Sequence, residues 1–138
     1  MIRSSLAAAV AIALALFAPP TAAFERGVQQ VAAVCASGSQ AQSDLCVALD
    51  TGNCGLARPS EDYWFCKGVV ERQCGLIADS PNYLFCEALR TRECGVVAGN
   101  RYQLCQGILE RDCRAASEAS QWMCVVLQDR FSDPAAVS

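Results

Sequence analysis

The stretch that decides the fold is CGLIADSPNYLFCEALRTREC, residues 74–94. A long step separates Cys74 from Cys86, and a short step separates Cys86 from Cys94. This alternation of long and short steps between cysteines continues in both directions along the chain. A fixed period of about twenty residues is typical of a repeat array. The cysteines that carry it are the candidate site residues of the chain: Cys35, Cys46, Cys54, Cys66, Cys74, Cys86, Cys94, Cys105, Cys113 and Cys124.

Other residue types recur at fixed distances from the second cysteine of each unit. Aromatic residues gather just before it: Tyr63, Trp64, Phe65, Tyr83, Phe85, Tyr102 and Trp122. Small residues follow it by two positions in the central units: Gly68, Ala88 and Gly107. Arginines follow it by six positions: Arg72, Arg92, Arg111 and Arg130. The repeat therefore extends beyond the cysteines to the whole unit.

Each unit has the signals of one helix and one turn. In the central unit Ser80 is a good N-cap, and Pro81 suits the first helical position. Phe85, Cys86 and Leu89 then share one face at helical spacing. A glycine such as Gly95 fits the left-handed residue that commonly ends a helix. The same signals in the other units predict helices near 25–35, 41–52, 60–73, 80–93, 100–112 and 117–130.

The fold class predicted from this pattern is all-α. Short helices joined by loops of about six residues favour antiparallel neighbours. We therefore expect an array of about six short antiparallel helices, arranged as helical-hairpin repeats and stapled by disulfides.

The first 23 residues have the three parts of a secretory signal peptide. Arg3 supplies the positive charge, residues 6–17 form an apolar run, and prolines and small residues follow. The run is too short to span a bilayer. We expect a signal peptide over 1–23, a repeat domain over 24–132 and a flexible tail over 133–138. The mature protein is then secreted or periplasmic, with no stable membrane span.

An oxidising compartment and an even cysteine count favour disulfides. Two cysteines eight residues apart in one helix lie about 12 Å apart along its axis. A disulfide needs Cα atoms roughly 4.4–6.8 Å apart, so pairs such as Cys66 with Cys74 are excluded if the helix reaches both. The longer steps cross a turn and give Cys35–Cys46, Cys54–Cys66, Cys74–Cys86, Cys94–Cys105 and Cys113–Cys124. Sequence alone does not fix connectivity, so this pairing is a prediction.

Composition narrows the possible functions. The chain has a net charge of −3 and no histidine. The acidic balance argues against nucleic-acid binding, which needs clustered positive charge. Without histidine, and with no phosphate-loop or nucleophile-elbow motif, we find no activated nucleophile and no acid–base pair. We therefore predict a protein that is not an enzyme, with no cofactor and no metal ligand assigned.

The remaining features have a structural and a functional interpretation. We interpret the aromatic residues as core packing beside the disulfides, the alternative being a ligand groove. We interpret the arginines as a solvated edge near helix C-termini, neutralised by nearby acids, the alternative being a site for an acidic partner. Glu61 and Asp62 are interpreted as dipole partners at a helix N-terminus, and the small residues as points of close helix approach.

The cysteine alternation over residues 35–124 resembles that of bacterial secreted proteins with short, cysteine-punctuated helical repeats. The architecture is also similar to that of twin Cys-x9-Cys helical hairpins, although the spacings differ, and no functional residue is implied by either resemblance. Cysteines eight residues apart on one helix would form a thiolate stripe suited to Cu(I), which resembles exported bacterial copper-storage bundles in outline.

The function predicted from the sequence is that of an exported, non-enzymatic binding or interaction module. Its partner would be a protein or an envelope component, contacted by one face of the array. Two alternatives remain open at this point: thiol-based Cu(I) sequestration, and a small secreted inhibitor or effector.

Overall fold

The computed structural model describes residues 33–131 of the chain, and its regular elements are all helical. The α-helices are α2 (Gln40–Thr51), α3 (Ser60–Glu71), α4 (Ser80–Thr91), α5 (Asn100–Glu110) and α6 (Gln121–Phe131). The 3-10 turns are η1 (Cys54–Leu56), η2 (Cys74–Leu76), η3 (Cys94–Val96), η4 (Cys113–Ala115) and η5 (Glu118–Ser120). No strand occurs between residues 33 and 131, so the predicted all-α repeat array is confirmed.

Parts of the sequence prediction fall outside this range. The signal peptide and the tail lie outside the described residues, and so does most of the helix expected over 25–35. The last three residues of that helix, 33–35, are helical.

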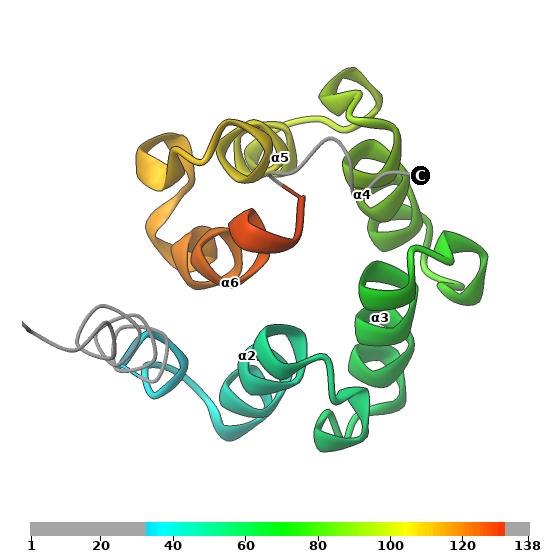
Figure 1. Cartoon of the computed structure of the whole chain (residues 1–138), viewed down its shortest axis with the longest axis vertical. Coiled ribbons are helices and arrows are strands. Elements are labelled where there is room, and N and C mark those ends of the chain that lie inside the picture. Colours follow the sequence, from blue (N-terminus) through cyan, green and yellow to red (C-terminus); the bar gives the residue numbers. More distant parts are fainter. Residues whose placement is uncertain (1–32, 132–138) are drawn as a thin grey trace, which may run out of the picture.

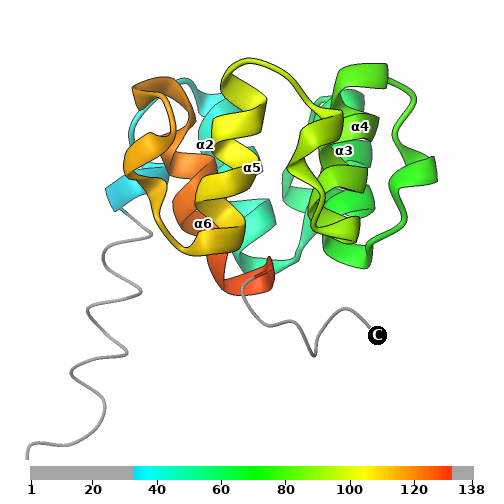
Figure 2. The same cartoon turned by 90° about the horizontal axis from the view of Figure 1, so that it is seen from above.

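The hairpin of each unit is formed by an α-helix and the segment that runs back beside it to the start of the next α-helix. We call this the return segment. Figure 2 shows the chain leaving one α-helix at its end, running back through a 3-10 turn and entering the next α-helix at the end where the previous one began. A helix of twelve residues is about 18 Å long, and the eight residues from Arg72 to Asp79 can reach about 26 Å. Successive α-helices therefore run in the same direction, which the expected antiparallel order did not anticipate.

The array closes into a ring. Helices α2 to α6 follow one another around a common centre, and α6 returns to pack against both α5 and α2 (Figure 1). We call the space enclosed by these helices the lumen. Each of these α-helices contains one cysteine, which we call the helix cysteine: Cys46, Cys66, Cys86, Cys105 and Cys124. Positions in each unit are counted from it, so that position +3 is three residues after the helix cysteine and position −1 is the residue before it.

The core fills the middle of the lumen. Position +3, one turn after the helix cysteine, carries an aliphatic residue with at most 1% of its surface exposed in every unit. These residues are Leu49, Val69, Leu89, Ile108 and Leu127. Position −1 lies one turn earlier on the same helix face, because residues four apart share a face. The lumen is thus closed in its middle by apolar side chains that each unit supplies in turn.

Helices α3, α4 and α5 end earlier than predicted, and at arginine rather than glycine, whereas α2 ends at the left-handed Gly52. Arg72, Arg92 and Arg111 are the C-cap residues of α3, α4 and α5, and each has a left-handed backbone with φ between 56° and 62°. Gly95, expected in that role, lies inside η3 and has no positive φ. At the other end of α4 the N-cap is Asp79, whose carboxylate accepts from the backbone N–H of Asn82, rather than Ser80.

The five disulfides join each return segment to a neighbouring α-helix. They are Cys35–Cys46, Cys54–Cys66, Cys74–Cys86, Cys94–Cys105 and Cys113–Cys124, with Cα–Cα distances of 5.4–5.7 Å. This is the predicted pairing, but one premise of the prediction was wrong. Cys74 begins η2, so it does not share a helix with Cys66.

The small residues at position +2 admit these return segments. A Cβ atom on Gly68 would lie 2.7 Å from the side chain of Ile77. On Gly107 it would lie 2.8 Å from the carbonyl oxygen of Asp112 and 3.2 Å from the sulfur of Cys124. The close approach predicted from the sequence is therefore present, and it is made chiefly by the return segment.

Candidate functional site

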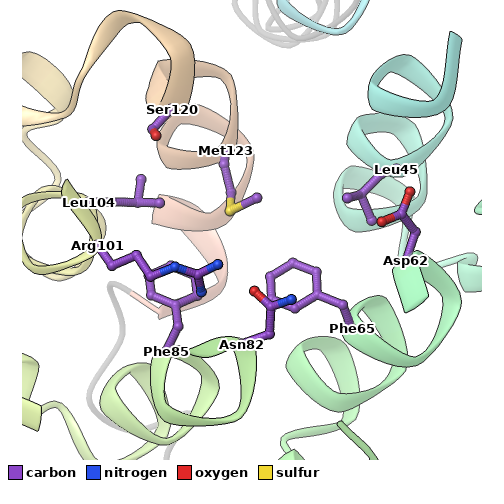
Figure 3. Close-up of a pocket in the computed structure, with 9 residues that line it drawn as sticks. All are labelled: Leu45, Asp62, Phe65, Asn82, Phe85, Arg101, Leu104, Ser120 and Met123. Carbon is purple, nitrogen blue, oxygen red and sulfur yellow. The ribbon is translucent and has the colours of Figure 1, made fainter. Parts of the chain in front are cut away.

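A cavity of about 230 Å³ lies in the lumen at the end where the α-helices begin. Residues from the five α-helices α2 to α6 and from η5 line it (Figure 3). Position −1 supplies the apolar wall: Leu45, Phe65, Phe85, Leu104 and Met123. Position −4 supplies the polar groups: Asp62, Asn82, Arg101 and Ser120. Each polar residue stands one helical turn before an apolar one, so both lie on the lumen face of the same unit.

Burial shows which way this cavity opens. The rings of Phe65 and Phe85 are buried, whereas Asp62, Asn82 and Arg101, one turn nearer the helix N-termini, are half-buried. The polar residues at position −4 therefore form the mouth, and the aliphatic residues at position +3 form the floor.

Asp62 is an ionisable group at the mouth with no partner there. It lies in the first turn of α3, and its side chain forms no hydrogen bond or ion pair with another residue between 33 and 131. Burial raises the pKa of its carboxyl, and the neighbouring Glu61 adds to the rise. The sequence interpretation placed this residue correctly at a helix N-terminus but did not assign it to a cavity.

Arg101 enters the mouth from α5. Its Nη1 donates to the carbonyl oxygen of Pro81 at 3.0 Å, and its guanidinium lies 5.8 Å from the centroid of the Phe85 ring. These contacts hold the side chain against α4 while leaving other N–H groups available, because a guanidinium has five of them in a fixed fork. The hydroxyl of Ser120 is bonded to that of Ser117 at 3.1 Å.

The opposite end of the lumen is occupied by arginines at position +6. Arg72 donates to the carbonyl oxygen of Arg130 at 3.0 Å, and its guanidinium lies 5.2 Å from the Phe131 ring centroid. Arg92 donates to the carbonyl oxygen of Phe131 at 2.6 Å. Two helices of the ring are therefore attached to the last turn of α6.

Arg130 completes this end by crossing to the first unit of the array. It donates to the carbonyl oxygens of Leu49 and Asp50 at 2.8 and 3.0 Å. Position +6 of that unit is Gly52, and a Cβ atom there would lie 3.1 Å from Nη2 of Arg130. The first unit thus has glycine at the place where an arginine from the last unit enters.

The predicted solvated arginine edge is wrong for most of its members. Arg72, Arg92 and Arg130 are half-buried and bind main-chain carbonyls instead of nearby acids. Arg111 alone resembles the expectation, since it is exposed and forms an ion pair with Asp129. The prediction that these arginines lie near helix C-termini is confirmed.

The aromatic residues divide between core and surface. Phe65 and Phe85 are in the core as predicted, and their rings also form part of the cavity wall. Trp64, Tyr83 and Tyr102 are exposed, each with about two fifths of its surface accessible. Core packing is therefore the wrong interpretation for these three.

A copper-binding stripe of thiolates requires cysteines eight residues apart on one helix. The helices stop at Glu71, Thr91 and Glu110, before the second cysteine of each short step. Such a stripe of sulfur atoms facing the lumen is therefore not formed, and each of the ten cysteines is in a disulfide.

The polar mouth was missed by sequence reasoning. Position −4 carries Gln, Asp, Asn, Arg and Ser in successive units, so it has no recurring residue type to draw attention. The available signal was its position, one helical turn before the apolar residue that precedes each helix cysteine. Extending the repeat alignment by one turn would have placed these side chains on one face.

Comparison with protein-family models, with curated proteins and with solved structures finds no match to this chain. No helix in the part of the chain described here is long and apolar enough to cross a membrane.

Proposed function

We propose that this protein is an exported, non-enzymatic binding module that takes a small molecule into the mouth of its lumen. The observation that carries the proposal is the cavity of about 230 Å³ with an apolar wall and a few polar groups at its rim. Ligand sites in proteins usually combine these features. The cavity is smaller than the roughly 300–1,000 Å³ of pockets for drug-sized ligands, which favours a smaller molecule.

Export is supported by the sulfur chemistry. Disulfides persist in oxidising compartments such as the periplasm and the extracellular space. The mature protein recovered from its native compartment should have the mass of the fully oxidised chain, and non-reducing peptide mapping should return the five pairs described above. Free thiols in freshly exported protein would contradict this part of the proposal and would favour thiol-based Cu(I) sequestration.

The lumen is tested by filling it. A library of small metabolites should raise the melting temperature of the mature protein for a subset of compounds, because a ligand that binds only the folded state stabilises it. Met123→Phe enlarges a half-buried residue of the cavity wall and should abolish these shifts. Val47→Phe, on an exposed site outside the cavity, should leave them unchanged. Equal shifts in both variants, or no shift with any compound, would contradict binding in the lumen.

A second candidate function rests on the exposed aromatic residues. Tyr83 and Tyr102 occupy the same position in successive units, and both are exposed. Exposed aromatic side chains suit contact with a protein or an envelope component, the class of partner proposed from the sequence. The double variant Tyr83→Ser/Tyr102→Ser should then release the exported protein from the envelope fraction. Unchanged retention would contradict an envelope partner at this surface.

A further inference from the structure

The mouth of the lumen holds two opposite charges that do not neutralise each other. Asp62 lies on α3 and Arg101 on α5, and Figure 3 shows them on opposite sides of the cavity. Neither forms an ion pair with the other or with another residue in the described range. An isolated charge in a half-buried site loses hydration without compensation, so opposite charges usually pair if they can reach.

The space between these charges is apolar. The rings of Phe65 and Phe85 lie 6.4 Å apart between centroids and are nearly parallel, with an interplanar angle of 17°. Leu104 and Met123 complete the wall on the side of α5 and α6. A ligand that reached from Asp62 to Arg101 would therefore pass over aromatic and aliphatic side chains.

We propose that the lumen binds a small amino acid of a particular kind, in which an amino group and a carboxylate stand at opposite ends of an apolar body. The ammonium group would face Asp62, and the carboxylate would face the free N–H groups of Arg101. Arginine suits this role because its planar fork matches the two oxygens of a carboxylate. The inference rests on the proposed function and adds the chemical class of the ligand.

Three further features of the mouth agree with this ligand. The pKa of Asp62 is raised by burial, which indicates a carboxylate that a bound ammonium group would stabilise. Arg101 lies in the first turn of α5, and the positive dipole end of that helix favours a carboxylate beside it. Asn82, between the two charged residues in sequence and on the same rim, offers both a donor and an acceptor.

The experiment uses three matched probes on the mature, oxidised protein. In 4-(aminomethyl)benzoate an aromatic ring separates the two charged groups, benzylamine keeps only the amine, and benzoate keeps only the carboxylate. Isothermal titration should show the tightest binding for 4-(aminomethyl)benzoate. Loss of either charged group should weaken binding at least about tenfold, the usual effect of one hydrogen bond to a charged partner.

Two variants assign the charges to their ends. Asp62→Asn should remove the advantage of 4-(aminomethyl)benzoate over benzoate and leave the affinity for benzoate unchanged. Arg101→Gln should remove its advantage over benzylamine in the same way. Far-UV circular dichroism and the melting temperature of each variant establish that the fold is retained, so that lost binding is not lost structure.

The outcomes separate this inference from the proposal on which it rests. If benzoate or benzylamine binds as tightly as the two-ended probe, or if L-phenylalanine with its adjacent charges does, the inference is overturned. If none of these probes binds while other compounds still stabilise the protein in a way that Met123→Phe abolishes, the ligand class is wrong and the lumen remains a binding site. If no compound binds at all, both proposals fail.

Discussion

Each end of the lumen is built from one position of the repeat, but the two positions differ in how much the residue type varies from unit to unit. At position +6 four of five units carry arginine, and three of these side chains bind main-chain carbonyls. At position −4 all five units carry different residues, and four of them surround a cavity. One end is uniform and internally bonded, and the other is varied and open.

This difference indicates that one end of the lumen stabilises the fold and that the other end binds a ligand. A carbonyl oxygen is the same in every unit, so one residue type can satisfy it throughout the ring. A ligand has a different group at each side, so the residues that meet it must differ from unit to unit. We therefore expect substitutions at the arginine end to affect stability, and substitutions at the mouth to affect binding while changing stability little.

The largest effect is expected from removing the disulfide that holds the last unit. Cys113→Ala/Cys124→Ala frees α6, the helix that packs against both α5 and α2, and a closed loop of this size contributes about 3 kcal/mol in the chain-entropy model. The melting temperature should fall, and small-angle scattering should report a larger radius of gyration because the ring opens. The control is Cys35→Ala/Cys46→Ala, which removes a loop of the same length that ties α2 to the segment before it and joins no two helices of the ring. Equal expansion in both variants would show that α6 does not close the ring.

A smaller loss is expected from Arg130→Ala, which breaks the uniform end alone. Two carbonyl oxygens at the end of α2 lose their donor, and the cost is about 2 kcal/mol of unfolding free energy. Urea unfolding measures it. Arg90→Ala is the matched control, because its ion pair with Glu87 lies on the exposed side of α4 and contributes less than about 1 kcal/mol. If the two variants lose the same stability, the crossing arginine does not hold the ring together.

The cysteine period made most of this architecture predictable. It gave the unit length, the helix-rich class and the disulfide pairing, because a disulfide reaches only a few ångströms and the longer steps cross the turns. The direction of the helices was not predictable from loop length alone. Eight residues suffice either for a tight antiparallel turn or for a full return, and the full return observed here packs the return segment against the small residue at position +2.

The helix ends were mispredicted for a reason that lies in the ring. Glycine is the usual residue with a left-handed backbone, so Gly95 was a sound expectation from local rules. Arginine takes that conformation at some energetic cost, and the cost is offset by hydrogen bonds to a helix that is distant in sequence. Such a long-range partner leaves no trace in a single unit. The same holds for the mouth, whose members come from four units and meet only when the array closes.

The third prediction isolates the cost of that left-handed arginine. Arg92→Ala and Arg92→Gly both lose the hydrogen bond to Phe131, but only glycine adopts φ of 62° without strain. Arg92→Gly should therefore be about 1 kcal/mol more stable than Arg92→Ala in urea unfolding. At Lys67, inside α3, the order should reverse, because glycine in a helix interior is about 1 kcal/mol worse than alanine. If the alanine variant were the more stable one at both sites, the left-handed backbone at Arg92 would be contradicted.

The smallest change in stability is expected at the mouth. Its sign tests whether the side chains at that end contribute to the stability of the fold. Burial raises the pKa of Asp62, so in the folded state the carboxyl holds its proton at pH values where the unfolded chain has released it. The contribution of this carboxyl to the free energy of unfolding therefore falls as the pH rises above 3.8, the ordinary pKa of an aspartate side chain. Asp62→Asn should raise the urea midpoint slightly at pH 7 and leave it unchanged at pH 3.

Asp112 provides the opposite case on the surface. Hydrogen bonds from Arg114 lower the pKa of its carboxyl to about 2, so its contribution is present at neutral pH and is lost as pH falls toward that value. Asp112→Asn should therefore lower the midpoint at pH 7, whereas Asp62→Asn raises it. If Asp62→Asn instead destabilises the protein at pH 7, its carboxylate has a stabilising partner within the fold. The mouth would then be structural like the arginine end, and the contrast on which the ligand proposal depends would disappear.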